Sequence, residues 1–239
     1  MTNPTAAMLV IGDEILSGRT RDANMHHLAK ELTLVGIDLK EARMVADEPD
    51  QIVEAVNQLR AKHTHVFTSG GIGPTHDDIT ADCIATAFSV AINVRDDAKA
   101  VLSTHYPNGE ADLTEARLRM ARIPEGADLI DNPVSKAPGF TVENVHVMAG
   151  IPSVFNAMLE GLLPKLRGGC PVQSETLRVE KPESVISKPL GQIAKAFPRL
   201  SIGSYPFYEG QSYGTHVVVR GIDMAEISAA MARVKEEVA

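Results

Sequence analysis

The stretch from Val66 to Thr80, VFTSGGIGPTHDDIT, combines glycines and carboxylates between a short apolar run and a helical pattern. The glycines are Gly70, Gly71 and Gly73, and the carboxylates are Asp77 and Asp78. Glycines permit positive φ angles and close approach of a ligand, and free N–H groups at a helix start suit a phosphate. Two carboxylates at the same end would repel bare phosphate. The stretch therefore favours a phosphate that arrives with a divalent cation.

Two familiar phosphate motifs are excluded for this stretch. No Gly-Lys-Ser/Thr follows, so it is not a Walker loop, and the glycine spacing differs from the dinucleotide-binding fingerprint. A structural alternative stays open, in which a tight strand–helix turn carries a solvated aspartate pair as its N-cap.

The elements around this stretch predict a sheet that gathers several polar segments at one rim. Apolar runs indicate strands over 6–11, 37–45 and 63–68, and each is followed by an amphipathic helical pattern. Alternating strands and helices predict a mostly parallel α/β sheet, in which ligands bind outside the carboxyl ends of the strands. Gly12-Asp13-Glu14, Asp47 and Ser69 to Asp78 each follow a predicted strand, so we expect them to meet.

The remainder of the chain predicts the rest of this domain and a second, smaller one. Helices are expected over 96–105 and 114–122, strands over 127–130, 139–142 and 145–149, and a helix up to Leu162. The glycine-containing segment 167–171 reads as a linker. A strand–helix–strand–strand–helix order from Thr176 to Val238 then predicts a small α+β unit. The predicted domains are residues 1–168, a three-layer α/β domain, and residues 172–239.

Net charge, hydropathy and cysteine content limit the kinds of partner and cellular environment to expect. The net charge of −8 argues against nucleic acid as the main partner. No window approaches the roughly 18 apolar residues of a membrane span, and Met1 to Thr5 has no basic region typical of a secretory signal. Cys83 and Cys170 form no metal-type pair, and free thiols in a cytoplasmic protein are expected.

The glycine stretch resembles the signature of the MoaB/Mog-type molybdopterin-binding domain, T-x-G-G-T-G followed by R-D-x-T. The matching segments are Thr68 to Gly73 and Asp77 to Thr80. The full motif, S-G-G-x-G-P-T-x-D-D-x-T, resembles more closely the amino-terminal domain of the competence/damage-inducible protein CinA. This branch of the family is similar also to the amino-terminal domain of FAD synthase. The phrase G-D-E-I-L-x-G at Gly12 to Gly18, with Asn24 after it, matches the same branch.

The resemblance implies roles for individual residues. Asp47 and Asp78 match the acidic residues of the pterin-nucleotide site, while Asp77 replaces the arginine of the family phrase. The ligand-binding positions that it implies, together with those expected from the glycine turn and the predicted rim, are Gly12, Asp13, Glu14, Asn24, Ser69, Gly70, Gly71, Gly73, Pro74, Thr75, Thr80, Gly150 and Pro152. Ala149 and Val154 depart from the family pattern, at a proline and at a frequent glutamate. The resemblance also implies a homo-oligomer, a dimer or trimer.

Two functions of different classes follow from these residues. The first is a hydrolase that uses a divalent metal, Mg²⁺ or a similar cation, on a nucleotide-linked diphosphate of the ADP-ribose or FAD type. Asp47 and Asp78 would hold the metal, and Asp77 would be an alternative ligand or a water-orienting base. The second is a molybdopterin- or nucleotide-binding module without hydrolysis. A purely structural domain would leave the carboxylates and glycines unused.

Several other side chains carry a structural and a functional interpretation. His76 lies inside the turn and His63 and His65 alternate at a strand start, yet no third metal ligand is near them in sequence. Lys136 is either a phosphate contact or a surface cation. Three tyrosines near Gly210, Tyr205, Tyr208 and Tyr213, belong either to an interface or to the packing of the small domain.

Overall fold

A computed structural model describes residues 3–210 and 212–238, which form two compact units divided between Gly169 and Cys170. Residues 1, 2, 211 and 239 of the two predicted domains lie outside the described residues. Among the residues that are described, no helix has both the length and the apolar content needed to cross a membrane.

The first unit is built on one six-stranded sheet, in the order β2-β1-β3-β8-β7-β6. Its strands are β1 (Thr5–Ile11), β2 (Asp38–Val45), β3 (His65–Ser69), β6 (Asp128–Ile130), β7 (Gly139–Val142) and β8 (Val145–Met148). β1 pairs in parallel with β2 and with β3, and β3 pairs in parallel with β8. β7 is antiparallel to both of its neighbours. The predicted mostly parallel sheet is confirmed.

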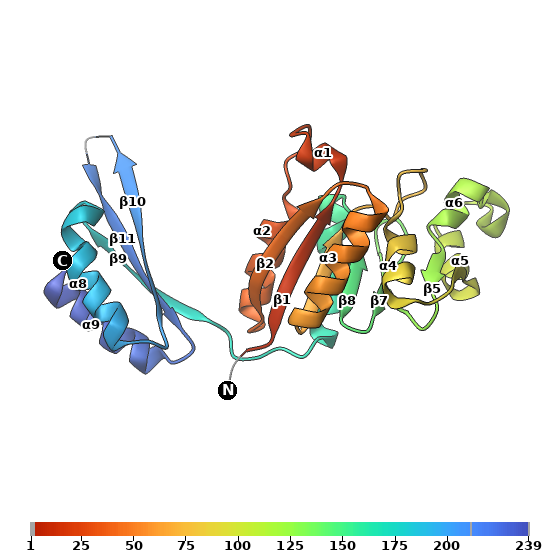
Figure 1. Ribbon diagram of the computed structural model, residues 1–239. Helices are drawn as coiled ribbons and strands as arrows, with labels where there is room; N and C mark the ends of the chain where they lie inside the picture. The colour runs from red at the N-terminus through yellow and green to blue at the C-terminus, as the bar shows by residue number, and fades with distance from the viewer. Residues whose placement is uncertain (1–2, 211, 239) are drawn as a thin grey trace. The chain divides into compact units, whose positions relative to one another are not determined.

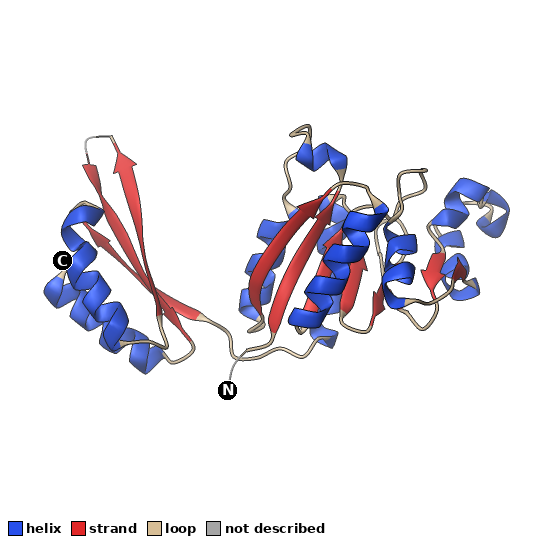
Figure 2. Cartoon of the chain, in the orientation of Figure 1, coloured by secondary structure: helices blue, strands red, loops and turns tan. Residues whose placement is uncertain are grey.

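Helices cover both faces of this sheet and create three layers (Figures 1 and 2). Successive residues of β1 point to opposite faces, as a strand requires. Ala6, Met8 and Val10 pack with α2 (Asn24–Leu34) and α7 (Pro152–Leu162). The alternate residues of β1 pack with α3 (Pro49–Lys62), α4 (Thr80–Phe88) and α5 (Asp96–Ser103). A strand buried on both sides explains the continuous apolar run in the sequence.

Short elements connect these layers. They are α1 (Asp13–Leu16), the 3₁₀ turns η1 (Gly109–Asp112) and η2 (Leu163–Lys165), α6 (Glu115–Arg119), β4 (Ile92–Val94) and β5 (Arg122–Pro124). β4 and β5 form an antiparallel pair that the sequence pattern did not predict. The helix expected up to Arg122 ends at Arg119, because Arg122 pairs with Val94 in the strand register and donates two hydrogen bonds to Asp82.

The second unit is a two-layer α+β fold, as the sequence predicted. Its elements are β9 (Gln173–Val179), α8 (Glu183–Ala196), β10 (Ser201–Glu209), β11 (Ser212–Gly221) and α9 (Met224–Glu237). The strands form an antiparallel sheet in the order β10-β11-β9. Val217 and Val219 of the central strand pack with Ile193 of α8 and Met231 of α9 in a core of its own.

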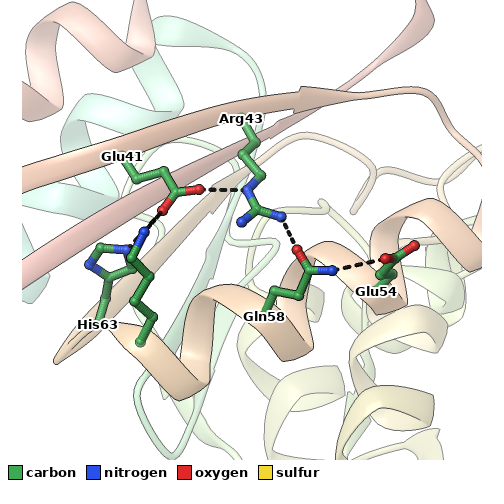
Figure 3. A network of polar contacts seen from close by, with 6 residues as sticks. Glu41, Arg43, Glu54, Gln58 and His63 are labelled. Carbon is green, nitrogen blue, oxygen red and sulfur yellow. Dashed lines mark hydrogen bonds and ion pairs between the residues drawn. The ribbon is translucent and has the colours of Figure 1, made fainter.

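Charged side chains protect the exposed edge of the large sheet at β2 (Figure 3). Glu41 accepts hydrogen bonds from Arg43 at 2.8 Å and from Lys62 at 2.6 Å, and His63 Nε2 lies 3.2 Å from the same carboxylate. Arg43 continues the network to Gln58 on α3. Charges on an edge strand oppose pairing with a strand of another molecule.

Candidate functional site

The carboxyl ends of four strands meet at one rim of the large sheet. The Gly12 N–H, after β1, donates to the Val45 carbonyl oxygen at the end of β2, at 3.2 Å. The Gly70 N–H, after β3, donates to the Met148 carbonyl oxygen at the end of β8, also at 3.2 Å. These hydrogen bonds hold in register the loops that follow the strands, where a parallel sheet places its ligand site.

The conformation of the glycine turn requires glycine at two positions, because a side chain at either would overlap neighbouring atoms. Gly70 has φ 109°, and a Cβ at this position would overlap the Ile11 carbonyl oxygen. Gly71 has φ 69°, and a Cβ there would overlap the hydroxyl of Thr80. Thr80 is fully buried under the turn, where its hydroxyl donates to Gly70 O at 3.0 Å and its N–H donates to Gly71 O at 2.9 Å. Thr80 therefore supports the turn from below.

The turn retains two backbone donors for an anion. The Gly70 N–H is already bonded to Met148, but no acceptor for the N–H of Gly71 or Gly73 is found within residues 3–210 and 212–238. Free N–H groups of a turn can bind an anion such as phosphate, although these two glycines precede the helix start at Thr80. Of the three glycines predicted to bind phosphate, Gly71 and Gly73 are therefore the two whose N–H groups could donate to a ligand.

Asp13 and Asp47 form a reciprocal pair across the rim. The Asp13 N–H donates to Asp47 Oδ2 at 2.9 Å, and the Asp47 N–H donates to Asp13 Oδ1 at 3.4 Å. Partial burial raises the pKa of the Asp47 carboxyl, the Asp13 N–H opposes the rise, and the charges of Asp13, Glu14 and Asp77 add to it. Asp77 is thus the member of the aspartate pair whose charge acts on Asp47.

The two adjacent aspartates have different surroundings. Asp78 Oδ2 accepts hydrogen bonds from the Thr75 N–H at 2.8 Å and the Thr75 hydroxyl at 2.6 Å. A Cβ at position 73 would lie 2.6 Å from the same oxygen, so Gly73 leaves room for this carboxylate. Asp77 is exposed, and its pKa is lowered by the neighbouring Thr75 side chain and by its own backbone N–H. Asp78 therefore orders the turn, whereas the Asp77 side chain is exposed to solvent.

Asn24 joins the start of α2 to the turn. Its Nδ2 donates to Ser69 Oγ at 2.7 Å and to the Gly150 carbonyl oxygen at 2.8 Å. Its Oδ1 is buried and has no hydrogen-bond partner in the part of the chain that the structure describes. Asn24, Ser69 and Gly150 line a recess of about 50 Å³ with Glu14. A ligand N–H or O–H in this recess would satisfy Oδ1.

The remaining predicted positions divide between the rim and other regions. Pro152, at the start of α7, lines the same recess as Asn24, and Pro74 and Thr75 form the exposed part of the glycine turn. Val154, at the family's frequent glutamate position, is buried in the core between the sheet and α7. A polar role at that position is absent from this chain.

The histidines singled out in the sequence do not converge on the rim. His65 begins β3, the end opposite the glycine turn, and its Nδ1 lies 3.2 Å from Nε2 of buried His146. Burial lowers the pKa of His146 to about 3, with a smaller effect from His65. His63 contacts Glu41, and His76 is fully exposed beside Asp77.

Lys136 and the three tyrosines lie outside the rim contacts. Lys136 takes a positive φ of 58° in a loop whose carbonyl and hydroxyl groups bond to Asn132. Tyr208 and Tyr213 stack across β10 and β11 in the second unit, with ring centroids 6.1 Å apart, and Tyr205 is exposed on β10.

Sequence reasoning missed an arginine beside the turn, Arg119. Arg119, the last residue of α6, donates from Nη2 to the Asp78 carbonyl oxygen at 3.1 Å, and its positive charge contributes to the lowered pKa of Asp77. Arg119 thus places a guanidinium at the turn, in which Asp77 stands at the arginine position of the family motif R-D-x-T. No local pattern could have found it, because the contact spans 41 residues of chain.

The donor chemistry of the rim suits a cation that the substrate helps to bind. Within the described residues, no group of three histidine, cysteine, aspartate or glutamate side chains is arranged to hold a metal ion by itself. Mg²⁺ needs no such cage, because it is commonly held by one or two carboxylates, waters and substrate phosphates. Asp78 lines the same small pocket as Gly71 and Gly73, and Asp47 and Asp77 are further carboxylates of the rim.

The fold and the rim together define an α/β domain with a glycine-rich turn and several carboxylates at the ends of its strands. A family model described as the probable molybdopterin binding domain matches residues 7–168, and a model of the FAD synthase middle domain matches residues 171–239. The chain belongs to the family of probable molybdopterin binding domains.

Individual relatives agree with this assignment. A protein of Aeropyrum pernix is 32% identical over 225 residues, which are 90% of this chain and 83% of that protein. A CinA-like protein of Desulfosudis oleivorans is 32% identical over 83% of this chain, which spans only 51% of that protein. The crystal structure of CinA from Thermoplasma acidophilum, whose function is stated to be unknown, has a TM-score of 0.63 and 33% identity, covering 68% of this chain and 97% of that one.

Proposed function

We propose that the chain hydrolyses a nucleotide-linked diphosphate, of the ADP-ribose or FAD type, with a divalent cation at the rim. The observation that carries the proposal is the convergence of the Asp13–Asp47 pair and the Asp77–Asp78 turn beside the donors of Gly71 and Gly73. Burial and the charges of Asp13, Glu14 and Asp77 raise the pKa of Asp47. A cation bound beside Asp47 would offset this repulsion, and a diphosphate would supply the remaining oxygen ligands.

In this proposal each residue has a defined task. Asp47 and Asp78 hold the cation, and the N–H groups of Gly71 and Gly73 bind phosphate oxygens. Asp77, which is exposed and whose charge acts on Asp47, accepts a proton from the attacking water or serves as a further ligand. Asn24 Oδ1 accepts a hydrogen bond from the ligand in the adjacent recess. The cation, when bound, neutralises phosphate charge and lowers the pKa of water.

The test uses ADP-ribose and FAD with Mg²⁺ and measures release of AMP together with ribose 5-phosphate or FMN. Asp47→Asn and Asp78→Asn should each lower turnover by more than about tenfold, because a metal carboxylate is lost. Their thermal midpoints should change by no more than about 4 °C, because asparagine keeps an acceptor for the Asp13 and Thr75 donors. Glu160→Gln, at an exposed position of α7, is the control.

Three outcomes separate the alternatives. Wild-type turnover in both variants at limiting Mg²⁺ would remove the metal assignment. Loss of turnover only through unfolding would make both aspartates structural caps of their loops. Tight binding of a nucleotide or pterin by the wild-type chain without product release would favour the binding module, which the matched family model also supports.

A further inference from the structure

A groove lies between the first two turns of α3 and one side of α4, next to the aspartate turn. Its volume is about 540 Å³, and its apolar lining includes Val53, Ile79 and Cys83. Asp50 and Glu54 of α3 add carboxylates. Small-molecule sites commonly have volumes of about 300–1,000 Å³, an apolar surface and a few polar groups that fix orientation.

We propose that this groove binds the heterocyclic half of the diphosphate substrate, an amine-bearing base with its hydroxylated sugar or side chain. The inference rests on the proposed function, because the groove is assigned as the second half of that site. The rim residues cannot recognise this half of the ligand by themselves, since metal and phosphate contacts are the same for every diphosphate.

The groove and the rim are continuous along the chain and through Arg119. Pro49 lines the groove two residues after Asp47, and Ile79 lines it directly after Asp78. Arg119 lines the groove and also donates to the Asp78 carbonyl oxygen. A ligand whose phosphates lie at the glycine turn can therefore extend past Arg119 into the groove, with the guanidinium beside the phosphate nearer to the sugar.

The polar groups of the groove favour a ligand that donates hydrogen bonds. Asp50 is exposed, and no side-chain donor to its carboxylate is found among residues 3–210 and 212–238. Glu54 accepts one hydrogen bond, from Gln58 at 2.8 Å, through Oε1. Carboxylates with capacity to accept suit sugar hydroxyls and an exocyclic amine, while the apolar lining suits the flat ring. Adenosine and a reduced pterin both have this chemistry.

The test fills the groove without touching the rim. Thr86 is an exposed α4 residue of the groove, and its hydroxyl bonds only within its own helix, to Asp82 O. Thr86→Trp places a large side chain there, and Gln51→Trp, at an exposed α3 position outside the lining, is the matched control. Calorimetry on the full chain with Mg²⁺ compares ADP-ribose with inorganic pyrophosphate, which has no heterocycle.

Thr86→Trp should weaken ADP-ribose binding by at least about tenfold and leave pyrophosphate affinity within about twofold, while Gln51→Trp changes neither. Asp50→Asn is a second variant that keeps size and fold, and it should weaken ADP-ribose alone. Competition by AMP and by a soluble pterin identifies which heterocycle the groove accepts. If Thr86→Trp lowered the affinities for ADP-ribose and pyrophosphate equally, or lowered neither, the groove assignment would be overturned. Because binding is measured, absence of hydrolysis with groove selectivity intact would overturn the proposed catalysis alone.

Discussion

Asn24 has a structural role in the rim and, in the proposed function, a ligand-binding role. Its two N–H donors tie α2 to Ser69 and Gly150, while Oδ1 is left buried without a partner among the described residues. A buried polar atom without a hydrogen bond has a cost of roughly 1–3 kcal/mol, so its retention points to a group that is satisfied when ligand is present. In the proposed function, the same side chain would connect the stability of the rim to ligand binding.

Asn24→Asp tests the structural half of this argument. Aspartate has the same shape but cannot donate, so the Gly150 carbonyl oxygen would lose its partner and face a carboxylate. We expect the free energy of unfolding at pH 7 to fall by about 1–3 kcal/mol, measured by urea denaturation. Asn93→Asp, at an exposed position of β4, should change it by less than about 0.5 kcal/mol. Equal stability of both variants would show that the Nδ2 hydrogen bonds do not hold α2 to the turn.

At the scale of elements, the strands of the large sheet and their common rim were predictable, whereas the β4–β5 pair and the contacts inside the loops were not. The apolar run from Ala6 to Ile11 predicted a doubly covered strand, and parallel strands necessarily end at one edge. The engagement of Asp78 with Thr75 and the approach of Arg119 depend on loop conformation and on distant segments, which local patterns do not encode. Arg122 was assigned to a helix for the same reason, since its pairing with β4 is non-local.

The edge strand β2 carries a network whose strength should depend on pH. Hydrogen bonds from Lys62, Arg43 and His63 lower the pKa of Glu41 to about 2, from 4.5 (Figure 3). A carboxyl whose pKa is lower in the folded state contributes stability above its unfolded pKa and loses that contribution as pH falls. The contribution of Glu41 should thus be constant above about pH 5 and disappear between about pH 4.5 and pH 2.

Glu41→Gln isolates this effect. The difference in free energy of unfolding between wild type and variant, from denaturation at a series of pH values, should be flat from pH 7 to pH 5 and shrink below pH 4.5. Glu160→Gln on α7 serves as the control for general acid effects. A difference that grows on acidification, or one that does not change down to pH 3, would contradict the assigned network.

At the scale of the whole molecule, the chain contains separate hydrophobic cores. Phe155 and Leu28 belong to a core of the first unit, whereas Ile193 and Val217 belong to the core of the second, and the clusters share no residue. The rim and its groove lie entirely in the first unit. The homo-oligomer implied by the family resemblance stays a prediction, which light scattering at micromolar concentration tests.

Separate cores predict two unfolding transitions in calorimetry, each sensitive to its own core. Ile193→Ala should lower only one midpoint and Phe155→Ala only the other, because both side chains are fully buried and truncation costs about 2–5 kcal/mol. In the smaller unit, each kcal/mol corresponds to about 4–8 °C. ADP-ribose with Mg²⁺ should raise only the transition that Phe155→Ala lowers, since a ligand stabilises the unit that binds it. A single transition shifted by both substitutions and by ligand would mean that the chain unfolds as one cooperative unit.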